Sequence, residues 1–155
     1  MKGISVLVAL SAALLVACGN DGLAPEGGPL RLEAAIGRST IGVGDTTSIV
    51  FRLRNVSRET VALSFPDSCQ VVPYITTPRV DEIVYPSGSA WGCLTVITQL
   101  VLAPGAEHVT KVLVRGGAQP MNPAVPLVPG EYRAYARLEH PSFPLRSVTI
   151  AFRVD

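Results

Sequence analysis

The sequence predicts an all-β domain, an immunoglobulin-like antiparallel β-sandwich of about seven to eight strands. Several segments alternate apolar and polar residues, which is the pattern of a strand with one buried face. Turn signals containing Pro or Gly separate these segments about every ten residues. No stretch of ten residues combines a 3.6-residue period with helix caps. We therefore expect strands and turns throughout.

Composition limits the chain to one ordinary domain. It has 155 residues, of which 48% are hydrophobic and 16% are charged, so a core can form and disorder of the whole chain is excluded. The 13 basic and 12 acidic residues nearly balance. Since such a balance creates no broad attraction for a phosphate backbone, we expect no nucleic-acid partner.

The first residues read as a signal peptide. A positive start is followed by an almost wholly apolar run from Ile4 to Val16, which is shorter than the roughly 20 residues that a membrane span needs. Leu15-Val16-Ala17-Cys18-Gly19 then resembles the lipobox of bacterial lipoproteins. The resemblance implies that residues 1–17 are removed and that Cys18 is lipidated. The alternative is an ordinary secretory signal in which Cys18 stands by chance.

Lipidation would place the protein in the cell envelope, because two or three acyl chains hold a protein on a membrane where one does not. The location would be the outer membrane, facing the periplasm, in a Gram-negative cell, and otherwise the outer face of the cytoplasmic membrane. Residues 18–29 are dense in Gly and Pro, and we interpret them as a flexible tether. The sandwich domain then covers residues 30–155.

Of the three cysteines, Cys69 and Cys93 remain if Cys18 is lipidated. Both would lie outside the cytoplasm, where a disulfide persists. Two thiols without a CxxC motif or a neighbouring His match no zinc spacing. We predict a Cys69–Cys93 disulfide worth about 3.5 kcal/mol in the chain-entropy model.

The strands are predicted in chain order. The alternating segments are residues 30–36, 49–54, 61–65, 132–139 and 148–155. Residues 55–58 read as a turn between the second and third of these segments. Residues 94–102 and 108–114 are rich in β-forming side chains, and Pro104-Gly105 marks the turn between them. Pro129-Gly130-Glu131-Tyr132 predicts a tyrosine corner, in which the Tyr132 hydroxyl bonds to the backbone upstream; a binding role for Tyr132 is the alternative.

From Phe51 to Leu138 the order of features resembles the intracellular proteinase inhibitor (BsuPI-type) domain family. The similar pieces are Phe51–Ser57, Thr60–Phe65, Trp91, Leu102–Gly105 and Pro129–Ala134. The resemblance implies an immunoglobulin-like fold and a protein-binding, protease-inhibiting activity. Residues 70–92 depart from the family pattern and lack its Gly-x-x-Val-Trp segment, so no inhibitory surface is carried over to them.

No pattern of catalytic residues is present, and we expect neither an enzyme nor a metal or cofactor site. His108 and His140 lack a second ligand at metal spacing, and we expect both at the surface. Asp81-Glu82 lacks the further oxygen ligands that calcium requires. Motifs for a serine nucleophile, a zinc protease or a phosphate loop are missing from the sequence.

Two segments are candidates for partner binding. The loop between the paired cysteines contains Arg79, Tyr85 and Trp91, and it could enter a protease cleft with Arg79 leading; alternatively, Trp91 packs against the disulfide. Pro120, Pro123 and Pro126 recur every third residue, which would line one ridge of a polyproline II segment that docks on an aromatic groove. The alternative is an extended edge segment that cannot pair with another sheet.

The sequence thus predicts a membrane-anchored extracytoplasmic lipoprotein that acts by binding rather than by catalysis. Its partners would be the membrane, through acyl chains on Cys18, and another protein. That protein is either a protease that the domain inhibits or an envelope component that it contacts as a structural module.

Overall fold

The computed structural model describes residues 28–79, 81–86, 92–118 and 124–155. The leader, Cys18, Trp91, Pro120 and Pro123 lie outside these ranges. Every regular element within them is a β-strand, and the fold is the predicted immunoglobulin-like sandwich. The described ranges contain no helix that is long and apolar enough to cross a membrane.

The described residues form twelve strands, which is more than the seven to eight predicted. They are β1 (Leu30–Ile36), β2 (Thr40–Ile41), β3 (Thr46–Asn55), β4 (Val61–Phe65), β5 (Val71–Thr76), β6 (Ile83–Tyr85), β7 (Thr98–Leu102), β8 (Glu107–Gly116), β9 (Val125–Leu127), β10 (Gly130–Leu138), β11 (Leu145–Arg146) and β12 (Ile150–Val154). The additional strands β2, β6, β9 and β11 have only two or three residues. So short a strand shows no alternation in the sequence, and only pairing with a neighbour reveals it.

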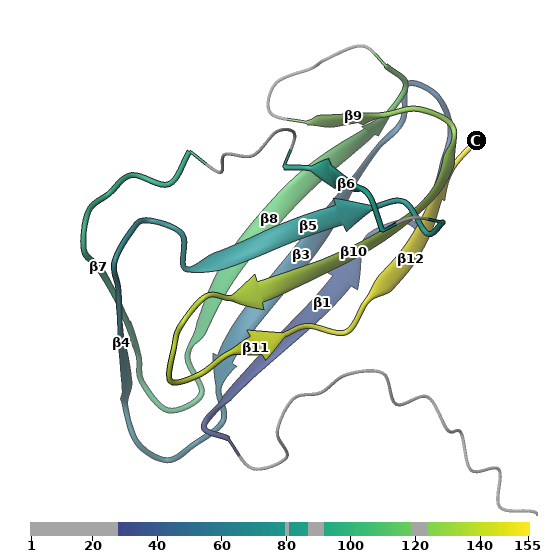
Figure 1. The fold of residues 1–155 in the computed structure, drawn as a ribbon. Helices are drawn as coiled ribbons and strands as arrows, with labels where there is room; N and C mark the ends of the chain where they lie inside the picture. The colour runs from purple at the N-terminus through teal and green to yellow at the C-terminus, as the bar shows by residue number, and fades with distance from the viewer. Residues whose placement is uncertain (1–27, 80, 87–91, 119–123) are drawn as a thin grey trace, which may run out of the picture.

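Two sheets form the sandwich (Figure 1). One has the order β1-β3-β8-β9, and the other has the order β2-β12-β10-β5-β6, with β11 also paired to β10. Figure 1 looks onto the second sheet, with β1, β3 and β8 behind it. The pairs β2–β12 and β8–β9 are parallel. Both sheets are therefore mixed, whereas the sequence predicted antiparallel pairing throughout.

The core lies between the two sheets and follows the predicted alternation. On β3, Ile49, Phe51 and Leu53 are at most 1% exposed, because every second side chain of a strand faces the same way. On β10, Tyr132 and Leu138 are buried on the face that packs against the other sheet. These side chains belong to one continuous hydrophobic cluster, so the two long strands fix how the sheets stack.

The strands β4 and β7 form a separate two-stranded ribbon along one side of the sandwich, at the left of Figure 1. The ribbon continues the β3–β8 pair beyond a shared corner. At the corner the Asn55 backbone N–H donates to the Ala106 carbonyl at 3.0 Å, and the Gly105 N–H donates to the Asn55 carbonyl at 3.0 Å. Gly105 has φ of 76°, a conformation that favours glycine. The predicted turns at 55–58 and at Pro104-Gly105 are both confirmed.

The Asn55 side chain fastens this corner from inside. It is fully buried, and its amide donates to the Glu59 carbonyl at 2.7 Å and to the Leu102 carbonyl at 2.8 Å. Its oxygen accepts bonds from the backbone N–H and the hydroxyl of Ser57. Asn55 therefore ties the first turn of the ribbon to the last residue of β7.

The tyrosine corner is confirmed on the other sheet. Tyr132 is 5% exposed, and its hydroxyl donates to the Val128 carbonyl at 2.7 Å. The Tyr132 ring stacks on Phe152 of the neighbouring strand with centroids 5.5 Å apart. Burial and this packing give Tyr132 a structural role.

Two predicted strands begin later than expected. The segment predicted as 94–102 becomes a strand only at Thr98, because the chain around Leu94 is drawn toward Ser68 by hydrogen bonds. The segment predicted as 148–155 begins at Ile150. There the buried Ser147 hydroxyl accepts the Ala136 N–H and donates to the Val148 carbonyl, which holds the chain out of strand geometry.

Candidate functional site

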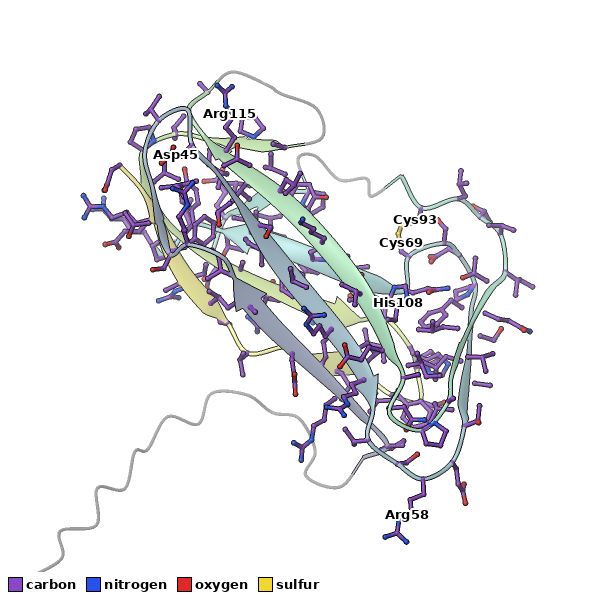
Figure 2. The ribbon with its side chains drawn as sticks, turned by 180° about the vertical axis from the view of Figure 1, so that it is seen from behind. Asp45, Arg58, Cys69, Cys93, His108 and Arg115 are labelled. Atoms are coloured by element: carbon purple, nitrogen blue, oxygen red, sulfur yellow. A yellow bond between two sulfur atoms is a disulfide. The ribbon has the colours of Figure 1, made fainter. Side chains whose placement is uncertain are left out.

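The predicted disulfide is present. It closes the end of the β4–β7 ribbon that is remote from Asn55, which is the upper end in Figure 1. Cys69 and Cys93 are bonded with their Cα atoms 5.4 Å apart, and Figure 2 shows them with His108 on one side of the molecule, away from Asp45 and Arg115. The carboxylate of Asp67 lies close to both sulfurs and accepts the Cys69 N–H at 2.8 Å. Because the sulfurs are bonded to each other, they offer no thiolate to a metal.

The segment that follows Cys93 is the most exposed apolar feature of this region. Leu94, Val96 and Ile97 are 69%, 50% and 75% exposed; we call residues 94–97 the Leu94–Ile97 loop. Val101, on the outer side of β7, is another 59% exposed aliphatic residue just beyond it. Aliphatic side chains gathered on an exposed surface mark interaction sites more often than single ones do.

The backbone of the Leu94–Ile97 loop is held in place. The Ser68 N–H donates to the Leu94 carbonyl at 3.1 Å, and the Leu94 N–H donates to the Ser68 hydroxyl at 2.8 Å. The Val96 N–H donates to the Leu94 carbonyl at 2.8 Å, which closes a tight turn. Together with the disulfide, these bonds fix the loop while its side chains face solvent.

Sequence reasoning missed this loop because Leu94-Thr-Val-Ile reads as strand-forming. The residues have high β-propensity, yet they do not alternate: Val96 and Ile97 are adjacent apolar residues. A break in alternation directly after a bonded cysteine was the available signal that the segment is not a half-buried strand.

A hollow of about 340 Å³ lies between the disulfide and β8. Its lining residues are Ser68, Cys69, Gln70, Val71, Val72, Gly92, His108 and Thr110. His108 is half-buried rather than on the surface as expected, and burial lowers its pKa. His140 is also half-buried and packs edge-on against Phe65, with ring centroids 5.3 Å apart. Both histidines were expected at the surface because nothing in their local sequence reports tertiary packing.

Arg79 lies at the opposite end of β5 from the disulfide. It follows β5 in the β5–β6 connection, which the Thr77 N–H closes by donating to the Glu82 carbonyl at 3.0 Å. Arg79 is exposed and borders an open hollow of about 590 Å³ together with Thr77, Pro78, Gly130 and Glu131. The crosslink therefore does not set Arg79 beside the Leu94–Ile97 loop.

The other described candidates for binding occupy different places. Tyr85 on β6 pairs with Ile75 and packs partly against the core, and its burial raises its pKa. Pro126 is exposed on β9, which pairs with the end of β8 in the other sheet. The structure thus distributes Arg79, Tyr85 and Pro126 over two sheets and does not gather them into one surface.

Comparison with known proteins identifies similar folds only. No family model and no curated protein matches the sequence. Among solved structures, the CARDB domain of a Pyrococcus furiosus protein has 15% identity and a TM-score of 0.46, covering 81% of this chain and 87% of that one. A β-glucosidase from Erythrobacter marinus has 13% identity and a TM-score of 0.46, and the match covers 81% of this chain but 15% of the enzyme.

A third similar structure is the sporulation control protein Spo0M from Bacillus subtilis. It has 12% identity and a TM-score of 0.41, and the match covers 83% of this chain and 50% of that one. Likeness at this level assigns no activity to the present chain.

Proposed function

We propose that this protein is a lipid-anchored, extracytoplasmic lipoprotein whose domain acts by binding another protein through the Leu94–Ile97 loop. The observation that carries the proposal is the set of three exposed aliphatic side chains on a backbone held by the disulfide and by Ser68. A loop that is already ordered loses less conformational entropy when a partner binds.

The available apolar surface is large enough to matter. Full burial of a Val, Leu or Ile side chain stabilises by about 1.5–3 kcal/mol. Since the three side chains are half to three-quarters exposed, their burial by a partner would contribute about 4 kcal/mol before the costs of association. That is the scale of a small hot-spot cluster.

A protease is the first partner class to test, because the segment from Phe51 to Leu138 resembles the BsuPI-type inhibitor domains. Arg79 in its exposed connection is then the alternative contact, suited to a protease that cleaves after basic residues. In contrast, the turn between Leu94 and Val96 favours the second function, a non-inhibitory interaction module of the envelope. A protease substrate binds in an extended form, and this turn is not extended.

The anchor is tested by the intact mass of the protein purified from membranes, before and after reduction and alkylation. The expected mass is that of residues 18–155 plus acyl chains, with two thiols that appear only after reduction. An unacylated mass would overturn the anchor and leave the binding proposal to be tested on a secreted domain.

Inhibition is tested by titrating subtilisin-like and trypsin-like extracellular proteases with the wild type and three variants. Loss of inhibition in Leu94→Asp would assign the contact to the Leu94–Ile97 loop, and loss in Arg79→Ala would assign it to the β5–β6 connection. Val43→Asp is the matched control, because Val43 is 68% exposed and Leu94 is 69% exposed. No inhibition at micromolar protein would overturn the inhibitor function.

Binding itself is tested in the native envelope with a photo-crosslinking residue at position 94 and, as control, at position 43. One discrete adduct formed from position 94 but not from position 43 supports the interaction module. Equal crosslinking from both positions, or none from either, contradicts a binding role for the loop.

A further inference from the structure

The outer face of the six-stranded sheet carries a second ordered set of side chains. Along β10 the inward side chains alternate with outward Arg133, Tyr135 and Arg137. Tyr74 of β5 is directly opposite Tyr135, and Arg146 of β11 is directly opposite Arg137. The pairing of three strands therefore brings two tyrosines and three arginines onto one surface.

These side chains form a stack. The rings of Tyr74 and Tyr135 are 5.1 Å apart between centroids and 19° from parallel. The Arg146 guanidinium carbon lies 3.8 Å from the Tyr135 ring centroid, a cation–π contact. We call Tyr74, Tyr135, Arg137 and Arg146 the Tyr–Arg platform. Stacking restricts Tyr74, Tyr135 and Arg146, and the ion pair with Glu139 at 3.9 Å restricts Arg137, so the platform presents its charges in a fixed arrangement.

The charges of the platform do not cancel. The Arg137 guanidinium forms an ion pair with the Glu139 carboxylate at 3.9 Å, and the neighbouring Arg133 forms one with Asp81 at 3.7 Å. In the described ranges, no carboxylate lies within ion-pair distance of Arg146. Like charges opposite each other on neighbouring strands destabilise a sheet, and an anion between Arg137 and Arg146 would relieve that repulsion.

Tyr74 takes part in the same electrostatic network. Burial raises its pKa, the charge of Glu139 raises it further, and a hydrogen bond from Arg137 acts in the opposite direction. Arg137 is therefore engaged both by Tyr74 and by Glu139. Arg146 is left as the cation that an incoming anion would meet.

The other sheet provides an internal comparison. Arg31 of β1 is directly opposite Arg54 of β3, so the same like-charge register recurs on its outer face. There Glu107 lies 3.9 Å from Arg54 and 3.6 Å from Arg52. Among the described side chains, neither Arg31 nor Arg54 is stacked on an aromatic ring. Arg31 is thus a matched control for the effect of charge alone.

The stacking geometry also indicates what kind of anion fits. The two rings cover each other's facing sides, and Arg146 covers the second face of Tyr135. Tyr135 therefore offers little free ring face on which a sugar ring could stack. A carboxylate, in contrast, matches the planar donors of a guanidinium in two parallel hydrogen bonds.

We infer that the Tyr–Arg platform binds carboxylates of an acidic, protein-borne segment, with Arg146 as the principal contact and Arg137 beside it. No platform residue belongs to the Leu94–Ile97 loop. This interaction surface is therefore additional to the proposed contact, and it stands or fails independently of it.

The test uses fluorescently labelled hexaglutamate as the probe and measures its anisotropy on titration with the full domain at low and at physiological salt. Arg146→Ala is expected to weaken binding about tenfold, the equivalent of one charge-assisted hydrogen-bonded contact. Arg146→Lys is expected to weaken it less, because the charge remains and the bidentate geometry is lost. Arg31→Ala is expected to change it less than twofold.

Three outcomes would overturn the inference. Hexaglutamate could fail to bind at millimolar concentration, or Arg31→Ala could weaken binding as much as Arg146→Ala, which would show attraction by charge alone. An oligoglucuronate of equal charge could also bind more tightly than hexaglutamate in an Arg146-dependent way, which would assign the platform to an anionic glycan. Circular dichroism of each variant confirms that the fold is retained.

Discussion

The two ends of the β4–β7 ribbon are fastened by different means. At the lower end the fully buried Asn55 side chain bonds to Glu59, Leu102 and Ser57. At the upper end the Cys69–Cys93 disulfide holds the chain, and the Leu94–Ile97 loop exposes aliphatic side chains that a core would normally bury.

The difference shows how a small sandwich can combine stability with an exposed apolar surface. At the Asn55 end, burial of a satisfied polar group fixes the turn. At the disulfide end, a covalent bond performs the fastening, so the apolar side chains are not required to hold the loop.

The largest expected effect is loss of the disulfide. Replacing both Cys69 and Cys93 by Ala should lower the free energy of unfolding by up to about 3.5 kcal/mol, because the unfolded chain regains the freedom of the open loop. Urea denaturation of the variant and the wild type measures the difference. A loss below about 1 kcal/mol would mean that hydrogen bonding to Ser68 alone holds the upper end.

The next effect is expected at the opposite end. Asn55→Ala should lower the free energy of unfolding by about 3 kcal/mol, because the buried Leu102 carbonyl and the partly buried Ser57 N–H lose their partners. The same urea experiment applies, with Val56→Ala as the control at the neighbouring position, which is 45% exposed. Equal effects of the two substitutions would contradict the fastening role of the Asn55 side chain.

Tyr132→Phe tests a second side chain that holds a turn by a hydrogen bond to the backbone, at a place away from the ribbon. It removes the hydroxyl that donates to the Val128 carbonyl and keeps the ring that stacks on Phe152. The expected loss is about 1 kcal/mol, the net value of one hydrogen bond, measured by thermal and urea unfolding. A loss as large as that of Asn55→Ala would show that the corner depends on more than this bond.

His108 offers a pH test of the disulfide end. Burial lowers the pKa of folded His108 below the ordinary value of 6.5, so the unfolded chain takes up this proton first as pH falls. The free energy of unfolding should therefore be highest above pH 6.5 and should decline as the pH falls below 6.5. In His108→Gln this part of the decline should disappear from stability curves measured from pH 8 to 5; an unchanged curve would contradict it.

The smallest effect on stability is expected in the Leu94–Ile97 loop. Ile97→Ser should change the free energy of unfolding by less than about 0.5 kcal/mol, because the 75% exposed side chain contributes little to the core. The same variant should reduce crosslinking to a partner from position 94. A large loss of stability would mean that the side chain is buried in solution.

Local sequence signals were sufficient where the relevant physics is local. Alternation on β3 and β10 identified the buried faces correctly, and Asn55, Pro104-Gly105 and Pro129-Gly130 marked turns that the structure contains. The tyrosine corner was predictable because its hydrogen bond spans only four residues. The disulfide was predictable by counting cysteines, since lipidation of Cys18 would leave a single pair.

The candidate sites were less predictable because they depend on strand pairing. The sequence drew attention to Arg79, Tyr85 and Pro126, which the structure separates. It did not indicate Leu94 or Ile97 as exposed, nor Tyr74 and Arg146 as neighbours of Tyr135. Tyr74 and Tyr135 are far apart in the chain, and no local pattern records that β5 and β10 pair in that register.

The sequence by itself determined the class of fold, the buried faces of the long strands and the main turns and, on the expectation that Cys18 is lipidated, the pairing of Cys69 with Cys93. Each follows from the two-residue period of a strand, from the backbone preferences of Gly, Pro and Asn, or from the number of thiols. Tertiary structure alone decided the short edge strands, the exposure of the Leu94–Ile97 loop and the assembly of the Tyr–Arg platform. These depend on register between distant segments and on which surfaces the packed sheets leave uncovered.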